Sequence, residues 1–206
     1  IASAKFFESL GFYEIARVED TLVFMENRRD GFGNYLRNLE KTKTGGKSAA
    51  LVMNANPFTL GHQYLVETAA AACDTLHLFV VSEDASLVPF AVRKRLVAEG
   101  VAHLPNVVLH DSGPYIISNA TFPSYFLKDE AAVISGHARL DLAVFTKIAK
   151  ALNITARYVG EEPTSQVTGL YNQIMAEQLP RAGIDCIIVP RKEVNGKAIS
   201  ASTVRQ

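Results

Sequence analysis

The sequence is poor in features that would commit it to nucleic acid, a membrane or a disulfide-stabilised scaffold. Lysine plus arginine number 21 and aspartate plus glutamate also 21, so the formal net charge is zero. That balance argues against a general electrostatic attraction to nucleic acid or to an anionic membrane. No apolar run is long enough to span a bilayer, and no signal-peptide pattern opens the chain. We expect neither nucleic-acid nor membrane partners.

Tryptophan is absent and there are only two cysteines. Cys73 and Cys186 form neither a C-x-x-C pair nor a disulfide framework. Both lie in apolar surroundings, so we expect two buried free thiols in a reducing compartment. Together with the composition, this predicts a soluble, cytoplasmic, metabolic protein.

From Ser48 onward, strand-like and helix-like segments alternate. Strands separated by helices imply right-handed crossovers and a parallel sheet. We therefore predict an α/β fold with a doubly wound, Rossmann-like parallel sheet over residues 48–206. The predicted strands are 51–53, 75–81, 107–109, 156–159 and 184–189, and the predicted helices are 61–72, 89–100, 140–152 and 167–179. Gly100 is expected just past the end of its helix.

Residues 1–40 differ in character from the rest and are predicted to form a separate α+β segment. A short amphipathic helix over 2–10 should end at Gly11, and strands over 12–15 and 21–25 should pair across a Glu19-Asp20 turn. The polar, glycine-containing stretch 41–47 is interpreted as a linker. Because the chain opens at Ile1 without methionine, we expect it to be part of a longer protein.

The most informative string directly follows the first predicted strand and reads Asn54-Ala55-Asn56-Pro57-Phe58-Thr59-Leu60-Gly61-His62. It predicts a tight turn and then a helix opening at Gly61-His62. A helix N-terminus offers unpaired N–H groups and a partial positive charge, which suit a phosphate. His62 and Thr59 can donate hydrogen bonds to phosphoryl oxygens, and Gly61 allows close approach of the backbone. The ATP-binding candidates here are Asn56, Pro57, Phe58, Thr59, Gly61 and His62, with Thr59 and His62 also catalytic.

A second string near the end of the sequence reads Ile199-Ser200-Ala201-Ser202-Thr203-Val204-Arg205. Ser200 and Ser202 can bind β- and γ-phosphate oxygens, and Arg205 can pair with them bidentately. We predict that Ile199, Ser200, Ser202 and Arg205 bind ATP and that Arg205 is also catalytic. Taken alone, either string has a simpler interpretation, a helix cap followed by solvated side chains.

Two further turns follow predicted strands at the same edge of the sheet, where ligands of doubly wound folds bind. Gly160 and Glu161 are predicted to lie near the nucleoside, although surface turns often carry glutamate. Lys192, beside Arg191, brings positive charge to the phosphates or simply ends a strand in solvent; both interpretations stay open. The spacings contain no Ser/His/Asp triad, Walker A loop or zinc-ligand set, so no protein-bound metal is predicted.

Thr59-Leu60-Gly61-His62 and the serine-arginine string match the T/H-x-G-H and I-S-S-x-x-x-R signatures of a nucleotidyltransferase superfamily, with Ala201 in place of the second serine. Longer runs, over 53–62, 78–81, 115–127, 159–163, 171–173 and 190–193, resemble the [citrate (pro-3S)-lyase] ligases, or citrate lyase synthetases. That resemblance covers residues 47–206. The segment 5–14 resembles the end of an N-acetyltransferase (GNAT) fold, which precedes the nucleotidyltransferase domain in that family.

The resemblance implies an acid–thiol ligase that uses ATP and Mg²⁺. Acetate and ATP would give acetyl-adenylate and pyrophosphate. The acetyl group would then pass to the phosphoribosyl-dephospho-coenzyme A thiol of the citrate lyase acyl carrier subunit, activating citrate lyase. Asn119 and Tyr125, in a long non-repetitive stretch after the third predicted strand, are candidates for holding the acid.

The residues themselves support only attack on an α-phosphate with loss of pyrophosphate. An adenylyltransferase that makes a nucleotide cofactor, from phosphopantetheine or nicotinamide mononucleotide, therefore remains an alternative. A non-catalytic scaffold is a third, which two intact phosphate-binding strings make less attractive.

Overall fold

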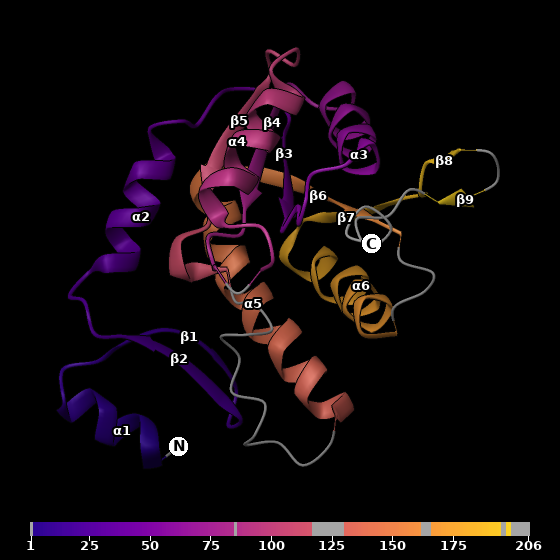
Figure 1. Cartoon of the computed structure of the whole chain (residues 1–206). Coiled ribbons are helices and arrows are strands. Elements are labelled where there is room, and N and C mark those ends of the chain that lie inside the picture. The colour runs from indigo at the N-terminus through magenta and orange to yellow at the C-terminus, as the bar shows by residue number, and fades with distance from the viewer. Residues whose placement is uncertain (1, 85, 117–129, 162–165, 195–196, 199–206) are drawn as a thin grey trace.

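The computed structural model describes residues 2–84, 86–116, 130–161, 166–194 and 197–198 (Figure 1). Its centre is a five-stranded parallel sheet in the order β5-β4-β3-β6-β7. The strands are β3 (Ser48–Met53), β4 (Thr75–Val80), β5 (Val107–Asp111), β6 (Ile154–Gly160) and β7 (Asp185–Val189). The predicted α/β, doubly wound class is confirmed.

The chain leaves β3 in one direction, through β4 to β5, and then returns to place β6 on the other side of β3. The sheet therefore has its topological switch point between β3 and β6, where ligands of such folds bind beyond the carboxyl ends. In register, Leu51 of β3 lies opposite Leu78 of β4 and Tyr158 of β6. The two turns singled out in the sequence, after β3 and after β6, thus start from adjacent strands.

Helices cover both faces of the sheet, which explains why its strands are almost continuously apolar. The helices of one face are α3 (Leu60–Ala71) and α4 (Phe90–Val101), and those of the other are α5 (Glu130–Leu152) and α6 (Gln166–Gln178). Val66 of α3 and Val97 of α4 belong to the same apolar core as Leu51 of β3. Phe145 of α5 and Ile174 of α6 belong to a second apolar core, on the other face of the sheet.

The N-terminal segment contains α1 (Ala2–Ser9), β1 (Tyr13–Val18), β2 (Leu22–Glu26) and α2 (Gly31–Glu40). As predicted, Gly11 ends α1 in the left-handed region at φ +86°, and β1 pairs with β2 antiparallel. Ile15, Phe32 and Leu39 belong to the same apolar core as Phe145 of α5. The segment therefore packs onto the α5 face of the sheet, although the division of the chain into domains at 41–47 stays a prediction.

Helix α2 was not predicted, because Gly31, Gly33 and Asn34 are poor helix formers. Tertiary contacts compensate: Phe32 and Leu39 are buried, and the Glu26 carboxylate accepts the Phe32 backbone N–H at 2.7 Å. The predicted start of α5 at residue 140 was also wrong. The helix begins at Glu130, and burial of His137 and Ala138 outweighs the weak helix propensity of Ser135 and Gly136.

Three smaller expectations need correction. Gly100 lies inside the last turn of α4 rather than beyond it. Cys73 and Cys186 are free thiols but only partly buried. The two-residue strands β8 (Glu193–Val194) and β9 (Lys197–Ala198), which pair antiparallel, were not anticipated.

Two buried histidines, His77 and His110, lie next to each other on neighbouring strands. His77 Nδ1 lies 2.9 Å from His110 Nε2, and the rings stack with centroids 5.2 Å apart. Burial lowers the pKa of both to about 4 from 6.5, and the His77 charge adds to the effect on His110. Between these values the unfolded chain binds protons that the folded chain does not. The free energy of unfolding should therefore fall as the pH drops from 6.5 toward 4, by up to about 1.4 kcal/mol per pH unit for each histidine.

Urea unfolding at a series of pH values tests this. A His77→Gln/His110→Gln double variant keeps polar side chains but does not titrate, so its stability should depend less steeply on pH. Equal slopes in the wild type and the double variant would show that the pair does not set the acid sensitivity.

Candidate nucleotide-binding site

The candidate site lies at the carboxyl edge of the sheet, at the switch point. The turn after β3 leads into α3, and the turn after β6 is tied to the end of β7. Glu161 donates its backbone N–H to Val189 O at 2.9 Å, and Arg191 Nε donates to Glu161 O at 2.9 Å. Three strand ends therefore meet here, as the sequence predicted for the first two.

Thr59 and His62 form a reciprocal cap at the start of α3. Thr59 is the N-cap residue with an extended backbone, and His62 is the third residue of the helix. The His62 backbone N–H points to Thr59 Oγ1 at 3.4 Å, while the Thr59 backbone N–H donates to His62 Nδ1 at 3.1 Å. The histidine thus takes the role that glutamate or glutamine usually has in a capping box. The two predicted residues are brought together, with the imidazole held against the helix start.

This geometry determines which ring nitrogen of His62 can act on a ligand. A backbone N–H can only donate, so Nδ1 must accept, and the neutral ring then carries its proton on Nε2. Burial lowers the pKa of His62, and the nearby positive charge of Arg191 lowers it further. At neutral pH the side chain is therefore an uncharged donor through Nε2–H, next to a helix N-terminus.

The Phe58 ring holds the His62 imidazole in this orientation. Its ring stacks on the His62 ring with centroids 5.7 Å apart and planes 22° apart. The Phe58 ring also packs so closely on α4 that a Cβ at Gly100 would lie 2.3 Å from Phe58 Cε1. The absence of a side chain at position 100 is what lets Phe58 reach its place under His62.

A fully buried arginine, which the sequence did not single out, donates hydrogen bonds to the loops that follow β3 and β4 beside the site. Arg93 of α4 is 0% exposed and donates to four backbone carbonyls. Nη1 reaches Asn54 O and Val81 O, each at 2.8 Å, Nη2 reaches Glu83 O at 2.6 Å, and Nε reaches Val88 O at 2.9 Å. One guanidinium therefore joins the carboxyl ends of β3 and β4. Its sequence context, Arg93-Lys94-Arg95, looks like a solvated helix face, so no local signal marked it.

Several residues that were predicted to contact the ligand instead form hydrogen bonds within the protein. The Asn56 carboxamide oxygen accepts Val88 N at 3.0 Å, and the Asn56–Pro57 peptide is cis. Gly160 O accepts Asn172 Nδ2 at 3.1 Å. These groups shape the two turns. Gly61 lies in the first turn of α3, one residue after its start at Leu60.

The two basic residues after β7 both lie near residues of α3. Arg191 lies close enough to His62 to influence its titration. Lys192 Nζ lies 5.6 Å from the Tyr64 ring centroid, which places this exposed residue beside α3.

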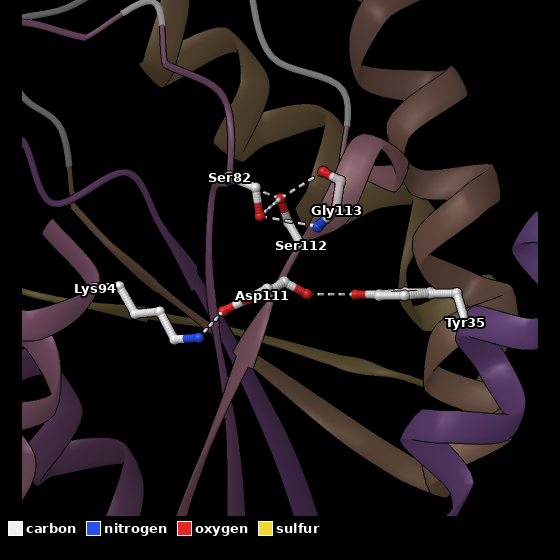
Figure 2. Close-up of polar contacts among 6 residues, drawn as sticks. All are labelled: Tyr35, Ser82, Lys94, Asp111, Ser112 and Gly113. Carbon is white, nitrogen blue, oxygen red and sulfur yellow. Dashed lines mark hydrogen bonds and ion pairs between the residues drawn. The ribbon is translucent and has the colours of Figure 1, made fainter. Parts of the chain in front are cut away.

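The ends of β4 and β5 are joined by a small polar network (Figure 2). The fully buried Ser112 accepts the Ser82 backbone N–H at 2.8 Å, and Ser82 Oγ accepts the Gly113 N–H at 2.9 Å. Lys94 of α4 pairs with Asp111 at 2.7 Å. These contacts hold the turn after β5 next to the loop after β4.

The predicted residues Asn119, Tyr125, Ile199, Ser200, Ser202 and Arg205 lie outside the described residues. In the part of the chain that the structure describes, no group of three or more His, Cys, Asp or Glu side chains could hold a metal ion. Over the same residues, no helix combines the length and apolar character needed to cross a membrane.

A parallel, doubly wound sheet with helices on both faces and a T-x-G-H turn at its switch point defines an α/β protein of the Rossmann-like class. The fold comparison agrees: pantoate–β-alanine ligase from Francisella tularensis superposes with a TM-score of 0.54 at 15% identity, over 83% of this chain and 71% of that one. The chain belongs to the citrate lyase ligase family, because residues 48–206 match the family's C-terminal domain.

Two relatives bear the name [citrate [pro-3S]-lyase] ligase. The protein from Klebsiella pneumoniae is 45% identical over 99% of this chain and 61% of its own length. The protein from Haemophilus influenzae is 42% identical over 98% of this chain and 63% of its own length. The chain therefore spans about three fifths of the length of these relatives.

Proposed function

We propose that this chain is an ATP-dependent acid–thiol ligase that activates citrate lyase. In the first step a carboxylate oxygen of acetate attacks the α-phosphorus of ATP. An acyl O–P bond forms, the bond from the α-phosphorus to the bridging oxygen breaks, and pyrophosphate leaves with the bond electrons. No proton is transferred, so the protein's task is to position the reactants and stabilise charge.

The observation that carries the proposal is the state of His62. An uncharged Nε2–H donor beside the α3 N-terminus suits the α-phosphoryl oxygens, which gain charge in the transition state. Because the Thr59 cap and the Phe58 ring hold the imidazole in advance, little reorganisation is needed. The pantoate–β-alanine ligase of similar fold was crystallised with β,γ-ATP and β-alanine.

The departing pyrophosphate is assigned to residues near the end of the sequence. Ser200, Ser202 and Arg205 hold its oxygens, with Ile199 beside them in the sequence and Lys192 as a further positive charge. Mg²⁺ enters with the triphosphate, whose oxygens are its preferred ligands. Gly160 and Glu161 border the nucleoside, which fits their place at the switch point.

In the second step the thiolate of the phosphoribosyl-dephospho-coenzyme A group on the citrate lyase acyl carrier subunit attacks the acyl carbon. A thioester C–S bond forms, the acyl C–O bond breaks and AMP leaves, while the thiol proton passes to solvent. Asn119 and Tyr125 orient the acid. We also propose a cytoplasmic location, since both cysteines are free thiols.

The test is exchange of labelled pyrophosphate into ATP by the wild-type chain. Exchange that requires acetate supports adenylate formation, and transfer of the acetyl group to the acyl carrier subunit supports the second step. Exchange driven by phosphopantetheine or nicotinamide mononucleotide instead of acetate would favour the cofactor-forming alternative.

The assignment of Arg205 gives a separate prediction. Arg205→Lys keeps the charge but loses the planar fork that can pair with two phosphate oxygens at once. We expect a higher KM for ATP together with a lower kcat, because the triphosphate is held in both the ground state and the transition state. Wild-type kinetics in Arg205→Lys would exclude a bidentate role.

A further inference from the structure

The N-terminal segment forms a hydrogen bond to the carboxyl end of β5, an edge strand of the sheet. The Tyr35 hydroxyl of α2 donates to Asp111 O at 2.9 Å, and Figure 2 shows it reaching across to that residue, opposite Lys94. Its ring packs on Tyr115, with centroids 4.9 Å apart. Burial, with the Asp111 and Tyr115 charges nearby, raises the pKa of Tyr35, so it remains a donor at physiological pH.

A second contact holds the same turn from β2. The Tyr115 hydroxyl donates to Glu26 Oε2 at 2.7 Å, while Glu26 Oε1 accepts the Phe32 N–H at 2.7 Å. Burial raises the pKa of Tyr115 to about 12, with help from the hydrogen bond to Glu26. A Cβ at Gly31 would lie 2.5 Å from Glu26 Oε2 and 2.9 Å from the Tyr115 hydroxyl. The packing here leaves no room for a side chain at position 31.

From this turn, hydrogen bonds alternate with short stretches of backbone as far as the T-x-G-H turn. Asp111 is followed by Ser112, which accepts the Ser82 N–H at 2.8 Å. The preceding residue, Val81, offers its carbonyl to Arg93, and the same Arg93 nitrogen donates to Asn54 O. Asn54 begins the loop that ends at Thr59. The ends of β5, β4 and β3 are thus aligned by one network whose outer anchor is Tyr35.

We propose that the N-terminal segment sets the alignment of these strand ends through Tyr35, which makes Tyr35 a positioning residue for adenylate formation. The effect on turnover rests on the proposed function; the effect on the T-x-G-H turn does not. Tyr35 touches no reacting group. It acts through Asp111, Ser112, Ser82 and Arg93, and a small displacement passed along them would misplace His62, on which the rate depends steeply.

Tyr35→Phe tests this, because it keeps the ring against Tyr115 and removes only the hydroxyl that reaches Asp111. Tyr13→Phe is the matched control, since Tyr13 lies in the same segment, is 45% exposed and stands outside the network. Amide hydrogen exchange is measured over residues 54–62 and 111–115. In Tyr35→Phe, exchange should be about fivefold faster over both ranges, a change on the scale of one neutral hydrogen bond. Tyr13→Phe should match the wild type.

Faster exchange confined to residues 111–115 would mean that Tyr35 is only a local structural contact and would overturn the proposal. In acetate-dependent pyrophosphate exchange, Tyr35→Phe should lower kcat about fivefold and change the KM for ATP less than twofold, because orientation is lost rather than ATP contacts. An unchanged kcat alongside an active wild type would also overturn it. If the wild type itself lacks exchange activity, the proposed function fails, and the amide exchange over residues 54–62 still decides the positioning role.

Discussion

Replacing His62 with alanine is expected to lower the rate of the proposed acetate-dependent adenylate formation by about 10²- to 10³-fold, the usual effect of removing one preorganised oxyanion donor. The Nε2–H donor disappears, while the turn stays in place through Arg93 and the Thr59 cap. The free energy of unfolding should fall by no more than about 1 kcal/mol, the typical worth of a capping interaction. Pyrophosphate exchange and urea unfolding of the same preparation measure the two effects.

Two further variants sharpen the test. His62→Gln retains an N–H donor on a side chain of similar reach, so it should keep more activity than His62→Ala. His103→Ala removes a surface histidine that pairs with Glu67 and should leave the rate unchanged. If His62→Ala keeps most of the wild-type rate, or loses it only because the protein unfolds, the donor role of His62 is wrong.

Arg93→Met is expected to be the most destabilising single substitution considered for the described residues. It keeps much of the apolar stem but removes the fully buried guanidinium, so the part-buried carbonyls of Asn54, Val81, Glu83 and Val88 lose their donor. Unsatisfied buried carbonyls cost about 1–3 kcal/mol each, and partial relaxation should bring the total to roughly 3–5 kcal/mol. Urea unfolding at pH 7 measures the loss.

Arg95→Met is the matched control in the same helix. Arg95 is largely exposed and pairs with Glu99 only at 3.8 Å, so its loss should cost less than about 1 kcal/mol. A similar stability for Arg93→Met and Arg95→Met would show that the buried guanidinium does not hold the two strand ends together.

Some residues of the candidate site could be predicted from the sequence, and others could not. Thr59 and His62 were recognisable because the start of a helix after an apolar strand, here proposed to bind phosphate, depends on residues adjacent in the chain. Arg93, Ser82 and Ser112 were not, because their partners are carbonyls and amides brought together from separate loops. The three charged residues Arg93-Lys94-Arg95 look alike in the sequence, yet the structure buries the first completely and leaves the other two at the surface.

By itself, the sequence determined the alternation of strands and helices, the parallel doubly wound class, and the place of the T-x-G-H turn at the start of α3, because each depends on local periodicity, capping and chain order. Tertiary structure alone decided that a glycine-rich stretch forms α2, that α5 starts at Glu130, and that one neutral tautomer of His62 points its proton away from Thr59. These outcomes depend on burial and on hydrogen bonds between distant segments, whose free energies exceed the local propensities that a sequence displays.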